Sequence, residues 1–176
     1  SLDKWILARL QALIAEMTAG LDDYDLPLAA KAAEGFVDDL SNWYVRLCRR
    51  RFWKGDYSED KIAAYQTLYR CLEVVAQLGS PIAPFFMERL YTDLNDVTGR
   101  IKADSVHLTD FPVADESQID FDLEERMELA QQISSMILSL RKRSNIRVRQ
   151  PLNKIMIPIL NEHNRTQLKA VENLIL

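Results

Sequence analysis

Apolar residues recur at intervals of three or four along most of this chain, which is the spacing of one face of an α-helix. Glycine and proline, which interrupt helices, number only 5 and 6 among the 176 residues. We therefore predict a mainly all-α fold. The clearest amphipathic segment runs from about residue 122 to 143, with Leu123, Met127, Ala130, Ile133, Ile137 and Leu140 at spacings of 4, 3, 3, 4 and 3.

Capping and helix-breaking residues set the expected limits of the helices. Gly20 is expected to stop the first helix, and Ser58 to cap the third. Pro27 and Pro84 suit the first turn of a helix. The expected helices cover residues 3–20, 27–53, 58–79, 84–94, 122–143 and 164–176, with a long connection over 95–118.

Each expected helix has an apolar face that we predict to be buried. On the first four helices these faces hold Ile6, Leu10, Leu13, Met17 and Leu21; Ala33, Phe36, Leu40, Trp43, Tyr44 and Leu47; Ile62, Tyr65, Leu68, Leu72, Val75 and Ala76; and Phe85, Leu90 and Leu94.

After Asn145 the pattern changes to alternating β-branched residues. Ile146 and Val148, followed by Ile155, Ile157 and Ile159, predict one or two short strands. We therefore expect a helical domain over residues 1–145 and the start of a small α/β subdomain over residues 146–176.

The composition, at 48% hydrophobic residues, is enough for one domain with a core. Cys48 and Cys71 lie inside helical patterns, so we expect buried thiols of a reducing compartment. The start of the chain is not that of a signal peptide, and no apolar run approaches the ~18 residues of a membrane span. We expect a cytoplasmic monomer without membrane contact, and the abrupt ends suggest a fragment cut from a longer protein.

Positive charge is concentrated in two stretches, although the net charge of the chain is -4. Neither stretch, 46–54 or 141–154, contains an acid, and together they hold half of the 22 Lys and Arg residues. A segregated basic surface beside aromatic residues is what a polyanion with stackable bases would need. The bases are Arg46, Arg49, Arg50, Arg51 and Lys54 in the first stretch, and Arg141, Lys142, Arg143, Arg147, Arg149 and Lys154 in the second.

The first stretch forms a candidate RNA-binding stripe. At about 100° per residue, Arg46, Arg49, Arg50 and Trp53 share one side of the helix, away from the apolar face. A solvated charged face with a cation-rich last turn is the simpler interpretation. Trp53 favours the other interpretation, because arginines with an aromatic ring are how proteins read single-stranded RNA loops.

Arg51 does not fit this stripe, since a straight helix would direct it toward the apolar side. It must then find a carboxylate, a carbonyl or a phosphate, or the helix ends earlier. Asp39 and Asn42 follow the same side as Arg46, which favours structural pairing with that arginine. Trp43 and Tyr44 are expected to be packing residues.

The second basic stretch lies where the fifth helix ends. Arg141, Lys142 and Arg143 could therefore neutralise a helix C-terminus or contact RNA, and both interpretations stay open. The chain shows no glycine-rich phosphate loop, metal-binding histidine pair or nucleophile elbow. His107 has no partner histidine nearby, so we interpret it as a structural hydrogen-bonding residue. Catalysis by this chain alone is not expected.

The stretch Asp38-Asp39-Leu40-Ser41-Asn42-Trp43-Tyr44-Val45-Arg46, followed by Arg49-Arg50-Arg51-Phe52-Trp53, closely resembles the tRNA-binding helical domain of isoleucyl-tRNA synthetases. Further landmarks are similar and occur in the same order, so the resemblance covers nearly the whole chain. They are Leu2-Asp3-Lys4-Trp5-Ile6-Leu7, Pro81-Ile82-Ala83-Pro84-Phe85, Ser105-Val106-His107-Leu108 and Arg147-Val148-Arg149-Gln150-Pro151-Leu152.

The resemblance implies an antiparallel helical bundle of the class I synthetase anticodon-binding type, followed by the start of an α/β junction. It implies isoleucine tRNA as partner, contact with a catalytic domain absent from this chain, and no cofactor held by this chain. The parent enzyme would join isoleucine to its tRNA using ATP with magnesium, and many relatives carry a C-terminal zinc module. The implied tRNA-binding residues are Arg46, Arg49, Arg50, Arg51, Trp53, Lys54, Arg141, Lys142 and Arg143.

Two other function classes compete with RNA binding. A helical bundle that docks on protein through leucine and tryptophan surfaces would expose apolar patches and bind no RNA. An independent enzyme would need a pocket of converging titratable groups, which the sequence does not offer.

Overall fold

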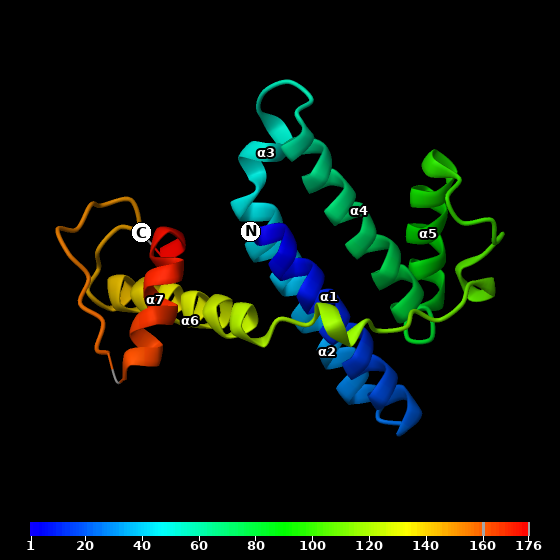
Figure 1. The fold of residues 1–176 in the computed structure, drawn as a ribbon, viewed down its shortest axis with the longest axis horizontal. Helices are drawn as coiled ribbons and strands as arrows, with labels where there is room; N and C mark the ends of the chain where they lie inside the picture. Colours follow the sequence, from blue (N-terminus) through cyan, green and yellow to red (C-terminus); the bar gives the residue numbers. More distant parts are fainter. Residues whose placement is uncertain (160, 176) are drawn as a thin grey trace. The chain divides into compact units, whose positions relative to one another are not determined.

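The computed structural model describes residues 1–159 and 161–175, apart from the side chains of residues 173 and 175. It divides into two compact units, Ser1–Ile119 and Asp120–Leu176, which are described separately. Figure 1 shows the helices in chain order. They are α1 (Leu2–Asp22), α2 (Leu26–Asp38), the π-helix η1 (Asp39–Val45), α3 (Arg49–Trp53), α4 (Glu59–Gly79), α5 (Pro84–Thr98), the 3-10 turns η2 (Val106–Leu108) and η3 (Glu116–Gln118), α6 (Phe121–Arg143) and α7 (Glu162–Ile175).

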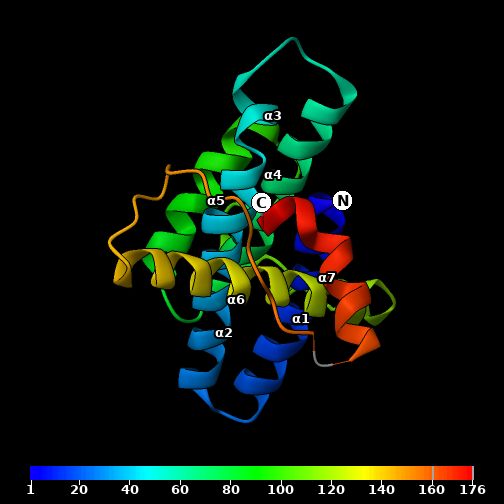
Figure 2. The same ribbon diagram turned by 90° about the vertical axis from the view of Figure 1, so that its left-hand side faces the viewer.

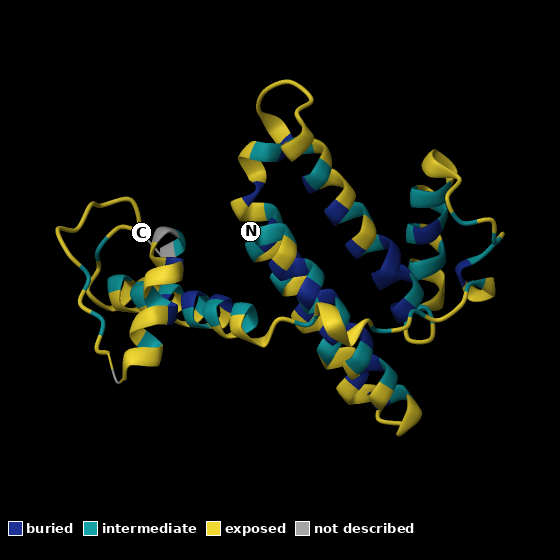
Figure 3. Ribbon diagram, viewed as in Figure 1, coloured by how far each residue is buried: buried dark blue, intermediate teal, exposed yellow. Residues whose placement is uncertain are grey.

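In the first unit, α1 packs against α2 and α4, and α4 packs against α5. Figures 1 and 2 both show α1 and α2 lying antiparallel as a hairpin. Four of the five residues of the predicted α1 face, Ile6, Leu10, Leu13 and Met17, are buried, and Leu21 is partly buried. Figure 3 shows buried positions along α1 and along the C-terminal half of α4. The mainly all-α prediction is confirmed.

Gly20 does not stop α1, which continues to Asp22. Instead, a Cβ added at Gly20 would lie 3.3 Å from the backbone nitrogen of Ala29, so the glycine lets α2 approach α1 closely. Two residues beyond the last helical residue, Asp22, the chain turns at Tyr24, whose φ of 59° is left-handed. Backbone bonds from Tyr24 to Leu21 and from Asp25 to Gly20 complete a Schellman motif there.

Helix α4 begins where the sequence predicts, with the Ser58 side chain accepting a hydrogen bond from the backbone N–H of Lys61. Its predicted buried face is wrong in the first turns, because Ile62 is 43% and Tyr65 46% exposed. The side facing the core there carries smaller residues, Ala64 and Thr67. The spacing of apolar residues predicts burial of the larger side chains, whereas the close packing of α4 on α1 buries the smaller ones.

Helix α5 extends past the predicted end at residue 94 to Thr98, and Gly99 ends it with a left-handed φ of 58°. Phe85, predicted to face inward, is 91% exposed. It lies in the first turn of α5, and the side chain buried further along is Tyr91. Tyr91 packs with Ala76 and Val106 in a second small core.

The second unit is built from α6 packed on α7. Met127, Ala130 and Ile133 are buried on α6, and Gln167 and Val171 are buried on α7. Its division from the first unit precedes α6, whereas the predicted domain boundary follows α6 at residue 145.

The predicted strands over Ile146–Val148 and Ile155–Ile159 are wrong. Residues 146–159 form turns and irregular backbone, and the described part of the chain contains no strand. Asn145, at φ 54°, ends α6 in a second Schellman motif, with Ile146 bonding back to the Arg141 carbonyl. Two short β-branched segments make at most an isolated hairpin, which is marginal in water without further strands. No helix among the described residues has the length and apolar character that crossing a membrane requires.

Candidate nucleic-acid interface

The helical segments from α2 to α3 keep five side chains at intervals of four on the buried face. They are Phe36, Leu40, Tyr44, Cys48 and Phe52. On an unbroken α-helix a spacing of four advances by about 40° per step, so this set would drift around the helix. The π-helical turns of η1 are wider and correct that drift.

This register places the first basic cluster outward. Arg46, Arg49, Arg50 and Lys54 are exposed, and Trp53 is 69% exposed. The expected outward orientation of the stripe is confirmed, although it comes from a π-helix and a break at Cys48 rather than from one straight helix.

The same register corrects the predicted apolar face beside the stripe. Leu47, expected in the core, is 38% exposed, and Trp43 is half-buried. The position that a regular α-helix would give to Leu47 is taken by Cys48, which is buried.

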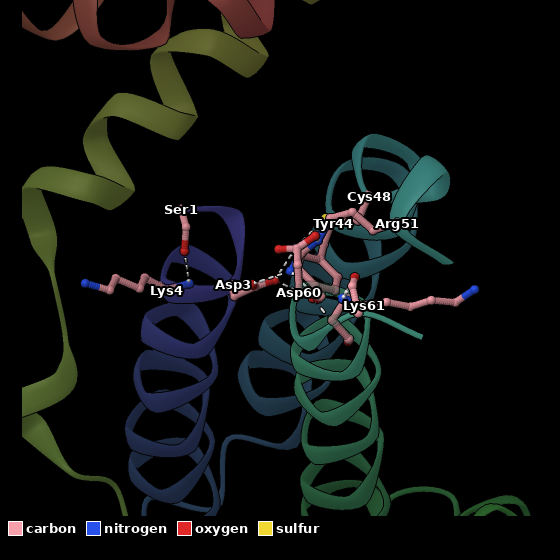
Figure 4. Close-up of polar contacts among 10 residues, drawn as sticks. Ser1, Asp3, Lys4, Tyr44, Cys48, Arg51, Asp60 and Lys61 are labelled. Carbon is pink, nitrogen blue, oxygen red and sulfur yellow. Dashed lines mark hydrogen bonds and ion pairs between the residues drawn. The ribbon is translucent and has the colours of Figure 1, made fainter. Parts of the chain in front are cut away.

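Arg51 is the inward-facing member of the cluster. Its Nη1 and Nη2 atoms lie 2.7 and 2.8 Å from the two carboxylate oxygens of Asp3, a bidentate pair. Its Nε lies 2.9 Å from Oδ2 of Asp60, and Nη2 also donates to the Asp60 carbonyl at 2.9 Å. Figure 4 shows these side chains converging from α1, α3 and the start of α4. Carboxylates and a carbonyl, two of the three kinds of partner predicted for an inward-facing Arg51, therefore bind this guanidinium.

Tyr44 completes this cluster from η1. Its hydroxyl donates to Oδ1 of Asp3 at 2.7 Å and lies 3.3 Å from the Ala64 carbonyl. The Arg51 hydrogen bonds lower the pKa of Asp3 below its ordinary 3.8. Burial, with the Asp3 carboxylate second, raises the pKa of Tyr44. We name Asp3, Tyr44, Arg51 and Asp60 the Arg51 clamp.

The remaining bases of the first cluster have no such partners. Within the part of the chain that the structure describes, no carboxylate lies in ion-pair range of Arg46, Arg49, Arg50 or Lys54. The Arg49 guanidinium lies over the Trp53 ring, with Cζ 5.6 Å from the ring centroid. The edge of Phe52 also contacts Trp53, at 6.1 Å between centroids. The indole is thus held in place while most of it stays accessible.

The polar residues preceding the stripe pair within the protein. Asn42 donates to Asp38, and Asp39 accepts from Arg9 at 3.4 Å. Asp39 does pair with an arginine, but this is Arg9, and Asn42 bonds to Asp38, so the expected pairing of both residues with Arg46 is wrong. Tyr44 is a packing residue, as expected, with the added hydrogen bond to Asp3.

The second basic cluster belongs to the other unit. Arg141 is half-buried, and its Nη1 donates to the carbonyls of Arg147 at 3.0 Å and Gln150 at 2.9 Å. Lys142 and Arg143 are exposed in the last turn of α6, where cations are favourable. One arginine here therefore stabilises the chain after α6, and its neighbours face solvent.

The described residues offer no metal-binding geometry. They contain no group of three His, Cys, Asp or Glu side chains placed to hold a metal ion. His107 is exposed in η2, where its backbone N–H donates to the Ser105 side chain. Burial raises the pKa of the Cys48 thiol and takes that of Cys71 to about 12, so both are unreactive thiols.

A family model described as the anticodon-binding domain of tRNA ligase matches residues 3–157 of this chain. The chain belongs to that family. The resemblance seen in the sequence around Asn42, Trp43 and Arg49 is thereby confirmed. The match includes both basic clusters and crosses the division between the two units.

Relatives of this anticodon-binding domain are isoleucine–tRNA ligases. The ligase of Cytophaga hutchinsonii is 56% identical over 174 residues, which are 98% of this chain and 16% of that protein. The ligase of Bacteroides thetaiotaomicron is 50% identical, with 99% and 15% covered. That of Dehalococcoides mccartyi is 43% identical, with 99% and 17% covered. The chain therefore spans about a sixth of the length of these curated relatives.

Proposed function

We propose that this anticodon-binding domain binds the anticodon stem-loop of isoleucine tRNA and positions it. Arg46, Arg49, Arg50 and Lys54 would contact phosphates, and Trp53 would stack on an unpaired base. The observation that supports this most is an exposed indole among cations for which the described residues supply no carboxylate partner. Phosphates would supply most of the affinity, and the ring would supply a contact that every base can make.

Arg51 is proposed as a positioning residue within this site. Its guanidinium is occupied by Asp3 and Asp60, so it has little to offer a phosphate. What it contributes is the attachment of α3 to α1 and α4. Lys142 and Arg143 are proposed to contact stem phosphates, with Arg141 holding the segment that follows them.

The chemistry is proposed to occur in parts of a longer protein that this chain does not include. That protein would join isoleucine to its tRNA with ATP and magnesium, and this domain would contact its catalytic domain. A cytoplasmic monomer is the proposed setting.

Titration of isoleucine tRNA into the 176-residue chain at rising salt tests the proposal. We expect affinity to fall steeply with salt, and the combined variant Arg49→Ala, Arg50→Ala, Trp53→Ala to lose most binding. Circular dichroism should show that the variant stays folded, since none of the three side chains is buried. Affinity that ignores ionic strength, or that survives the triple variant, would contradict the site.

Protein docking is the second candidate, because α5 exposes apolar side chains. Phe85 is 91%, Phe86 68% and Val97 85% exposed. This alternative predicts that Phe85→Ser with Phe86→Ser abolishes association with a protein partner while leaving RNA titrations unchanged. Unchanged association of that variant with the protein partner would contradict protein docking through α5.

A further inference from the structure

The turn between α3 and α4 carries a second exposed aromatic ring, Tyr57, at 82% exposure. An exposed tyrosine alone indicates nothing. This one, however, is held: the Lys61 ammonium lies 5.1 Å from its ring centroid. The same ammonium donates to the Gly55 carbonyl at 3.2 Å, which ties the turn to the first turn of α4. The ammonium contact therefore favours one position of the ring.

Trp53 and Tyr57 share this arrangement at the two ends of one turn. Each ring is largely exposed, and each has a cation over it, Arg49 for the indole and Lys61 for the phenol. They are four positions apart in the chain, so covalent geometry keeps their Cα atoms within about 15 Å. That range suits nearby bases of one unpaired RNA strand. Favouring one position of each ring beforehand lowers the entropy cost of binding.

The charges around Tyr57 differ from those around Trp53. Asp56 and Glu59 are exposed beside it, and Asp60 is engaged by Arg51. Lys61 is the base near the ring, and it already contacts the Gly55 carbonyl. Such a mixed surface does not attract phosphate strongly, whereas a stacking contact is available to any base.

We propose that Tyr57 is a second base-stacking position, binding an unpaired base near the one on Trp53 in a single-stranded RNA loop. The inference rests on the proposed function, since it adds a subsite to the same RNA surface. It requires that Tyr57 contribute through its ring and leave the number of phosphate contacts unchanged.

The test uses the 176-residue chain and an isoleucine anticodon hairpin with 2-aminopurine in its loop. Tyr57→Ala should weaken binding about fivefold or more, with an unchanged slope of affinity against salt. Tyr57→Phe should restore binding, because it keeps the ring. Stacking quenches 2-aminopurine fluorescence, so the quenching at one loop position should be lost in Tyr57→Ala and return in Tyr57→Phe.

Tyr24→Ala is the matched control, since Tyr24 is also a turn tyrosine, 92% exposed, in the turn between α1 and α2. Figure 1 shows this turn at the opposite end of the first unit from the turn between α3 and α4. Wild-type affinity in Tyr57→Ala with weakened binding in Trp53→Ala would overturn this inference and leave the proposed function standing. Equal loss in Tyr57→Phe and Tyr57→Ala would also overturn it. If the Trp53 and arginine variants bind like wild type, the proposed function itself fails.

Discussion

The two basic clusters look alike in sequence but differ in what their arginines do. In each cluster one arginine is bound within the protein and others are exposed. Arg51 bonds to the carboxylates of Asp3 and Asp60, of which Asp3 lies 48 residues away. Arg141 bonds to backbone carbonyls only six and nine residues away. The first cluster therefore connects three helices, and the second stabilises one local turn.

The two basic clusters also differ in what they offer a ligand. In the first cluster four bases have no carboxylate partner among the residues that the structure describes, whereas residues 141–154 contain no aromatic side chain. A high local density of basic residues therefore indicates a ligand site only after the bases that bind other groups of the protein have been excluded. What remains in the first cluster is a stacking ring with cations, and in the second it is cations alone.

Breaking the Arg51 clamp should have the largest effect. Asp3 and Arg51 side chains are only 20% and 22% exposed, so Arg51→Ala leaves a carboxylate in a partly desolvated site without its partner. We expect a loss of about 3 kcal/mol in the free energy of unfolding, measured by urea denaturation. Arg50→Ala is the control, and its exposed side chain should change stability by less than about 0.5 kcal/mol. Similar midpoints for the two variants would contradict the division of roles.

The second-largest effect is expected on RNA affinity, which should depend more on the first cluster than on the second. For an unpaired loop, each lost phosphate contact lowers the slope of log affinity against log salt by about 0.7, so Arg49→Ala with Arg50→Ala should lower it by about 1.4. Lys142→Ala with Arg143→Ala removes the same charge from the second cluster and should weaken affinity less, since residues 141–154 contain no aromatic side chain. A larger effect from the second pair would reverse the proposed ranking.

Parts of this fold were accessible from sequence because they depend on local chemistry. Ser58 caps α4, and α6 spans 121–143 against a predicted 122–143. The π-helix could not be predicted from the sequence. Its i to i+5 hydrogen bonding is favourable only where the packing of Phe36, Tyr44 and Phe52 against other helices stabilises it. The strands failed because β-branched alternation predicts a pleated face but supplies no neighbouring strand.

The candidate site, like the fold, could be predicted only in part from the sequence. The outward orientation of Arg49, Arg50 and Trp53 followed from helical spacing. The Asp3 partner of Arg51 could not be found, since a contact across 48 residues leaves no periodic signal. The Tyr57 and Lys61 pair was missed although its spacing of four at the start of a helix was a usable signal.

Acid should weaken the clamp in a predictable direction. The Arg51 hydrogen bonds lower the pKa of Asp3 in the folded state, so its contribution is fully present above the unfolded value of 3.8 and is lost as pH falls through the folded value. Each unit of lowering contributes about 1.4 kcal/mol. Asp3→Asn should therefore be less stable than wild type near about pH 6, and the gap should narrow as pH falls below the unfolded value of 3.8. A gap that is constant with pH would show that the Asp3 charge is not what stabilises the clamp.

The smallest effect on stability is expected for Arg141, the arginine of the second cluster that binds backbone carbonyls. Arg141→Ala removes two hydrogen bonds to the carbonyls of Arg147 and Gln150, but both of those residues are exposed, so water replaces the guanidinium. We expect a loss of about 1 kcal/mol in the free energy of unfolding. Faster amide hydrogen exchange should be confined to residues near 145–150. Lys142→Ala, which removes a neighbouring charge without a carbonyl contact, should leave exchange unchanged. If Arg141→Ala instead destabilised the chain as much as Arg51→Ala, the contrast between a clamp that joins three helices and a local brace would not hold.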